Sequence, residues 1–248
     1  MRSILIVEPG PLATVQDRGR YGLRAWGVPL SGAMDPQAFR IANLLIGNAD
    51  NAAGIEITLG GFQARFGCAA HFAVTGAIPG AFLNGAPVES WRAHRAKEGD
   101  LLRIDIPNCP PHRIEARLSK NTRESKSGSG SCARSDFSHP GLPSFFGEAT
   151  KRFCASTSRV DKVFFPGCGL RTYLAVSGGI DLPLVMQSRS TYLRGGFGGL
   201  GGRALRAGDE LPLGTPTRRP KDHPAPAALI PPYGRKSALH VITGPQDE

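Results

Sequence analysis

The sequence lacks most of the motifs by which catalytic chemistry is recognised directly. It has no GxxxxGK[ST] phosphate loop, no HExxH zinc motif and no GxSxG nucleophile elbow, and its six histidines are scattered. Its five cysteines show no CxxC spacing, so neither a zinc site nor a disulfide framework is indicated, and free thiols are predicted. These absences argue against P-loop, zinc and serine-nucleophile enzymes, and no metal is expected.

Long hydrophobic runs are also missing. The N-terminal apolar run covers only Ile4 to Val7, which is too short for a signal peptide, and no later stretch approaches the length of a membrane span. We therefore expect a cytoplasmic protein. At 248 residues, with 40% hydrophobic and 20% charged residues, the chain can bury one good core or two small ones.

The net charge of +10 would ordinarily raise nucleic acid or an anionic membrane as a partner. Half of this excess lies in residues 107–166, which carry ten Lys and Arg against five Asp and Glu. The remainder is spread among turns, without an RNA-binding aromatic pattern or a helix-turn-helix signature. The distribution predicts no nucleic acid and no membrane as partners.

One helix is predicted over residues 35–47, because both of its ends can be read. Asp35 suits the N-cap, Pro36 the first helical position, and Gly47 a left-handed stop. The positions with the i, i+3, i+4, i+7 spacing that faces a core are Ala38, Ile41, Ala42 and Leu45.

Most of the remaining pattern is typical of short strands. The 32 glycines and 21 prolines predict many turns, and Asn84-Gly85 suits a two-residue hairpin turn. The strands are expected within residues 2–8 (as an edge strand), 13–16, 53–58, 62–66, 71–75, 81–88, 101–106, 171–176 and from 207 onward. Strands at roughly ten-residue spacing with one principal helix predict a mainly β fold, an antiparallel β-barrel.

The composition changes abruptly at residues 107–166. The segment is dense in Ser, Lys, Arg and Gly and cannot bury enough apolar surface to offset its ordering entropy, so we expect a disordered insertion. It is either a surface loop of this protein or an artefact of the gene model. The predicted barrel then consists of residues 1–106 and 167–214, and the Pro/Arg-rich residues 215–248 form a linker and the start of a further region.

Polar residues suited to holding a small planar anion gather in two segments. Arg20 can offer a fork to a carboxylate, Asp17 can orient it, and Gln16 and Asn43 are neutral hydrogen-bonding groups. Further substrate-binding candidates are Ser31, at the loop before the helix, and Ser188, Arg189 and Thr191. For each of them a structural role in a turn or surface ion pair stays open, and no catalytic residue is assigned.

A specific family resemblance rests on long, ordered motifs. Residues 14–35 read T-x-Q-D-x-G-R-x-G-x(4)-G-V-P-x-S-G-A-M-D, and matching runs continue at 42–48, 56–61, 74–77, 171–181, 188–194 and 202–214. This pattern resembles the biotin-dependent carboxyltransferase family. That family includes the KipI-antagonist proteins, the C subunit of bacterial 5-oxoprolinase and the second carboxyltransferase subdomain of urea carboxylase, also called allophanate hydrolase subunit 2.

The resemblance implies a cyclophilin-like barrel in a subunit of an ATP-dependent amidohydrolase or carboxylase. It further implies ATP as a cofactor, biotin carried by a partner domain, a small amide such as 5-oxoproline or urea as substrate, and a KipI-like partner, which corresponds to the B subunit of 5-oxoprolinase. The alternatives are a non-catalytic regulator that binds a KipI-like kinase inhibitor, or an inactive truncated product. The last is considered because residues 239–246 resemble only the start of the family's second half.

Overall fold

The computed structural model describes residues 2–77, 80–105, 171–231 and 233. All of these belong to one unit, Met1–Pro111 with Phe165–Glu248. The expected insertion at 107–166 and residues 234–248 lie outside the described residues. Within the described ranges, no helix is both long and apolar enough to cross a membrane.

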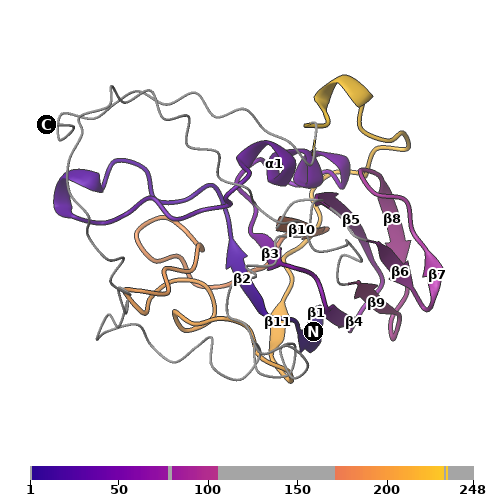
Figure 1. The fold of residues 1–248 in the computed structure, drawn as a ribbon, viewed down its shortest axis with the longest axis horizontal. Helices are drawn as coiled ribbons and strands as arrows, with labels where there is room; N and C mark the ends of the chain where they lie inside the picture. Colours follow the sequence, from indigo (N-terminus) through magenta and orange to yellow (C-terminus); the bar gives the residue numbers. More distant parts are fainter. Residues whose placement is uncertain (1, 78–79, 106–170, 232, 234–248) are drawn as a thin grey trace, which may run out of the picture. The chain divides into compact units, whose positions relative to one another are not determined.

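Two antiparallel sheets make up the described fold (Figure 1). The first has the order β11 (Glu210–Pro212), β1 (Ser3–Pro9), β4 (Phe62–Phe66), β9 (Leu101–Ile104), β6 (Ala81–Leu83) and β7 (Ala86–Pro87). The second has the order β2 (Leu12–Gln16), β3 (Gly54–Thr58), β10 (Arg171–Val176), β5 (Ala70–Gly76) and β8 (Ala93–Ala96). Because β10 lies between β3 and β5, residues from both sides of the 107–166 segment pair in one sheet.

The two sheets share one apolar core, and strand alternation explains its composition. In β1, Ile4 and Ile6 are fully buried in this core, and in β3 the same holds for Ile55 and Ile57. Successive side chains of a strand point to opposite faces, so every second residue enters the core. Each fully buried aliphatic side chain contributes about 1.5–3 kcal/mol of hydrophobic stabilisation. The mainly β barrel predicted from the sequence is confirmed.

The predicted helix is present as α1 (Pro36–Leu45), slightly shorter than expected. The Asp35 carboxylate caps it by accepting from the Ala38 N–H at 3.0 Å, and Gly47 has the left-handed φ of 74° that ends it. The apolar face of α1 packs on the outer face of β5 and β10, where Phe39 meets Tyr173 edge to face with ring centroids 5.8 Å apart. This contact places the start of α1 over the second sheet.

Three details differ from the sequence-based expectation. The strand expected at an edge, β1, is paired on both sides, with β4 and β11. The strand β8 is not predicted, because in Ala93–Ala96 only Ala96 is buried and no apolar alternation announces it. Two short 3₁₀ helices, η1 (Arg24–Trp26) and η3 (Ala227–Leu229), also occur in segments expected to be loops.

A long loop follows the end of β2. Residues 20–30 form a projection that carries η1, and we call it the finger; its base is closed by hydrogen bonds from Arg20 N to Leu30 O (2.7 Å) and from Ala33 N to Asp17 O (3.0 Å). Gly19 is required at this base, because a Cβ there would lie 2.5 Å from the Leu30 carbonyl oxygen. In Figure 1 the finger lies beside the loops that follow β10.

The helix cap gives a direct test of the fold. We expect Asp35→Ala to lower the free energy of unfolding by about 1 kcal/mol, because the Ala38 N–H loses its acceptor. Asp35→Asn keeps an oxygen at this position and is the matched control, with a loss of only a few tenths. Urea unfolding followed by circular dichroism measures both, and equal losses in the two variants would show that the cap is not the source.

Candidate functional site

Asp17, at the end of β2, is the centre of the polar network that the structure assembles. Its carboxylate accepts hydrogen bonds from the Gly19 N–H (2.7 Å), the Arg189 N–H (2.6 Å) and the hydroxyls of Ser188 (2.7 Å) and Ser190. The carboxylate is buried, so these four donors replace the water that it has lost. Asp17 thereby fixes residues 188–190 against the end of β2, and each of its oxygens accepts at least one hydrogen bond.

Arg20 is the largest fully buried side chain of this region, with 1% of its surface exposed. Its Nε donates to the Val185 carbonyl at 3.2 Å, its Nη2 donates to the Ser190 carbonyl, and its guanidinium stacks on the Phe197 ring at 4.9 Å. Burial lowers the pKa of the guanidinium from its ordinary value, and the nearby charge of Asp17 opposes that shift. Because two nitrogens are already engaged, the bidentate fork expected of Arg20 is not available to a ligand; Nη1 has no hydrogen-bond partner in the described residues.

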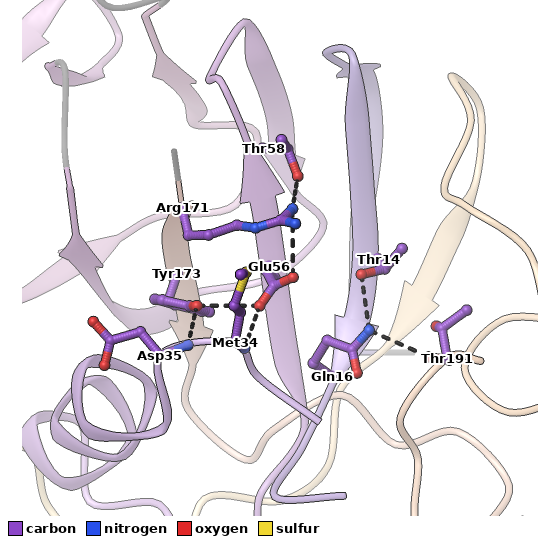
Figure 2. Close-up of polar contacts among 9 residues, drawn as sticks. All are labelled: Thr14, Gln16, Met34, Asp35, Glu56, Thr58, Arg171, Tyr173 and Thr191. Carbon is purple, nitrogen blue, oxygen red and sulfur yellow. Dashed lines mark hydrogen bonds and ion pairs between the residues drawn. The ribbon is translucent and has the colours of Figure 1, made fainter. Parts of the chain in front are cut away.

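Gln16 and Thr191 adjoin this network, as the chain neighbours of Asp17 and Ser190, and Figure 2 shows the hydrogen bonds of Gln16. The Gln16 Nε2 donates to Thr14 Oγ1 at 3.0 Å and to the Thr191 carbonyl at 3.4 Å, and Thr191 Oγ1 donates to the Val15 carbonyl at 2.9 Å. Gln16 is 7% exposed, and its Oε1 has no partner among the described residues. Six of the eight predicted residues are therefore brought together: Gln16, Asp17, Arg20, Ser188, Arg189 and Thr191.

The other two predicted residues do not join this network. Asn43 is buried at the end of α1, where its amide donates to the Ala52 carbonyl and its oxygen accepts from Asn48, each at 3.0 Å. Both ends of that side chain serve the fold. Ser31 is half-buried in the loop before α1, in a left-handed conformation with φ of 54°.

A second polar network, not predicted from the sequence, surrounds Glu56 on β3 (Figure 2). The Glu56 carboxylate accepts from the Met34 N–H (2.8 Å) and from the Tyr173 hydroxyl (3.1 Å), and Arg171 Nη1 lies 3.6 Å away. The Tyr173 hydroxyl in turn accepts from the Asp35 N–H at 2.7 Å.

This second network connects the sheet to the start of α1. Burial, and secondarily Glu56, raises the pKa of Tyr173 far above its ordinary value, so its hydroxyl stays protonated and acts as a donor to Glu56. Glu56 and Thr14 are cross-strand partners and lie, with Gln16, on the sheet face opposite the core. A carboxylate inside the apolar run of β3 is the signal that could have revealed this network.

Two hollows adjoin the Asp17 network on the side of the finger. The first, of about 290 Å³, has a mainly polar lining made of Asp17, Arg18, Gly19, Tyr21, Asn51 and Gln187; we call it the polar hollow. The second, of about 380 Å³, is the apolar hollow, and it is lined by Tyr21, Leu23, Trp26, Val28, Met186 and Gln187. Tyr21 and Gln187 border both. No cluster of metal-ligating side chains occurs in the described part of the chain.

Comparison with known proteins shows the family to which this fold belongs. The family model described as "Carboxyltransferase domain, subdomain A and B" matches residues 26–110 and 155–248, more than half of the chain. The protein belongs to this carboxyltransferase family. The two matched ranges leave out residues 1–25 and residues 111–154, and the latter fall within the stretch of unusual composition.

The chain is also similar to individual proteins of known name. The chain is 36% identical over 214 residues to the C subunit of 5-oxoprolinase from Escherichia coli, covering 86% of this chain and 50% of that protein. It is 31% identical to the urea amidolyase of Lachancea kluyveri, covering 90% of this chain and 9% of that protein. The crystal structure of the K. lactis urea amidolyase matches with a TM-score of 0.65 and 28% identity, over 92% of this chain and 11% of that one. The chain thus spans about half the length of the 5-oxoprolinase component that it matches.

Substitution of Asp17 tests how much its hydrogen bonds contribute to the stability of the site. We expect Asp17→Asn to cost about 2 kcal/mol or more of unfolding free energy, because an amide group would face donors that need an acceptor. Asp181→Asn is the matched control: Asp181 pairs with the same residue, Arg189, but is 60% exposed, and its loss should cost at most about 1 kcal/mol. Chemical denaturation measures both, and equal small losses would show that the Asp17 network contributes little.

Proposed function

We propose that this protein is a carboxyltransferase-type subunit of an ATP-dependent amidohydrolase or carboxylase that acts on a small amide of the 5-oxoproline or urea type. The observation that carries the proposal is the 36% identity to the C subunit of 5-oxoprolinase, which extends over 86% of the chain. The match with urea amidolyase supports the same class of substrate, since 5-oxoproline and urea each contain a carbonyl bonded to nitrogen.

The Asp17 network is the proposed substrate end of the site. The buried atoms Gln16 Oε1 and Arg20 Nη1 have no partners among the described residues, and both lie in or beside the network that the sequence predicted to hold a planar anion. Both atoms are shut off from solvent, so the substrate would lie in the adjoining polar hollow, and Arg20 would act by holding the Val185 carbonyl in place. Preorganised donors that line this hollow can stabilise charge that develops on a carbonyl oxygen during reaction.

The resemblance implies ATP, but the glycine-rich stretch 195–202 of the described residues does not form a phosphate-binding loop. A phosphate-binding loop needs free backbone N–H groups at the start of a helix. In the glycine-rich stretch 195–202, the Gly199 N–H donates to the Arg189 carbonyl and the Gly202 N–H to the Gly198 carbonyl, and the chain continues as turns. We therefore propose that ATP is bound, and biotin carried, by a partner subunit or domain, with a KipI-like protein as the expected partner.

The experiment that tests the proposal is reconstitution. The full chain is combined with purified KipI-like and remaining subunits of a bacterial 5-oxoprolinase that lacks its own C subunit, and ATP hydrolysis is measured with 5-oxoproline, urea or proline. We expect 5-oxoproline- or urea-dependent hydrolysis from the mixture and none from the isolated chain.

Proline is the control substrate, since it has the ring and carboxylate of 5-oxoproline without the amide. Tight binding of the KipI-like partner with no turnover of any substrate would instead favour the non-catalytic regulator. Robust turnover by the isolated chain would contradict the requirement for partners.

A further inference from the structure

The turn from Val185 to Ser188 has a backbone conformation that its two central residues disfavour. The residues at its ends exchange hydrogen bonds, Val185 N to Ser188 O at 2.9 Å and Ser188 N to Val185 O at 3.3 Å. Both central residues are left-handed, with φ of 53° at Met186 and 62° at Gln187. Two positive φ values in a two-residue hairpin define a type I′ turn.

Type I′ turns favour Asn-Gly because side chains such as Met and Gln meet steric resistance in the left-handed region. The same protein shows the favoured solution at the β6–β7 hairpin, where Asn84 and Gly85 have φ of 52° and 85°. Met186 and Gln187 occupy positions that disfavour them, although the same chain uses Asn-Gly in its other type I′ turn. This difference indicates a role for the side chains of Met186 and Gln187.

The surrounding structure holds the turn in this conformation. The buried Arg20 donates through Nε to the Val185 carbonyl at one end, and the Asp17 carboxylate accepts from the Ser188 hydroxyl at the other. Two buried charged groups therefore clamp the ends of a hairpin whose tip is exposed. This clamp can hold the turn in its strained conformation, since backbone strain persists only where neighbouring contacts over-determine it.

The tip residues reach the two hollows beside the finger. Met186 lines the apolar hollow together with Trp26, which is 82% exposed, and Gln187 lines both hollows. The polar hollow is also lined by Asn51, a second carboxamide, and by Arg18, whose guanidinium lies 5.8 Å from the centre of the Tyr21 ring. Two carboxamides and an arginine form a donor and acceptor set that matches an amide together with a carboxylate.

We propose that the polar hollow binds a small amide bearing a carboxylate, and that Gln187, presented by the strained turn, determines specificity for the amide. Asn51 completes the carboxamide pair, Arg18 receives the carboxylate, and Met186 supports the finger from the apolar side. Asp17 and Arg20 are positioning residues that act through the turn. The ligand class rests on the proposed function, whereas the special role of the turn rests on its geometry.

The test compares two substitutions that both suit a left-handed backbone. Gln187→Gly removes the carboxamide, and Gln187→Asn keeps a carboxamide on a shorter arm. Binding of 5-oxoproline to the full chain is measured by calorimetric titration, the melting temperature by thermal unfolding, and KM and kcat in the reconstituted assembly.

We expect both variants to melt at or above the wild-type temperature. For Gln187→Gly the melting temperature should rise by about 2–4 °C, because glycine relieves the backbone strain. Gln187→Gly should weaken 5-oxoproline binding about five- to tenfold and raise KM with little change in kcat. The reason is that the lost hydrogen bond would stabilise the bound substrate and the transition state equally. Gln187→Asn should stay within about threefold of wild type in affinity. Wild-type affinity in Gln187→Gly, or a parallel fall of affinity and melting temperature, would overturn the inference.

The outcomes separate this inference from the proposed function. Binding that is weakened in Gln187→Gly, without turnover in the assembly, supports the site and contradicts the proposed function. Turnover with a KM unchanged in Gln187→Gly supports the function and overturns the site. Absence of both binding and turnover with wild-type chain overturns both.

Discussion

The buried carboxylate of Asp17 is the interaction on which the site depends. It joins segments about 170 residues apart in sequence, since its hydrogen bonds connect the end of β2 to Ser188, Arg189 and Ser190. A buried carboxylate without donors would be strongly unfavourable, so the donors of residues 188–190 allow Asp17 to be buried where the two segments meet. Arg20 adds a second connection through the Val185 and Ser190 carbonyls. The polar hollow lies directly beside this connection, and its wall is built from the same two segments together with Asn51.

Much of the fold could be predicted because its signals are local. Asp35, Pro36 and Gly47 mark the ends of α1, and Asn84-Gly85 marks a hairpin, since each residue type matches a specific backbone requirement. Strand pairing is not local. The position of β1 between β4 and β11 depends on residues about 200 positions away, so nothing in its own sequence distinguishes it from an edge strand.

Six residues that the structure brings together around Asp17 could be named from the sequence, but their contacts and the residues that line the polar hollow could not. The sequence indicates Gln16, Asp17 and Arg20 because these polar residues cluster in a glycine-containing segment. The cluster does not show which of their atoms already make hydrogen bonds within the protein. Only the three-dimensional contacts show that the Nε and Nη2 of Arg20 serve backbone carbonyls. Gln187 is not among the predicted residues for a similar reason: its significance lies in a φ of 62°, which the surrounding clamp imposes and which its residue type disfavours.

The central claim is that the Asp17 network and the turn it clamps form the ligand-binding face of this carboxyltransferase-type domain. Amide hydrogen exchange of the full chain, with and without saturating 5-oxoproline, tests it most directly. The account predicts slower exchange on ligand addition in peptides covering residues 16–21 and 185–191, and no change in the β6–β7 hairpin, which makes no part of either hollow. Protection confined to the β6–β7 hairpin or to other regions, with residues 16–21 and 185–191 unchanged, would contradict it.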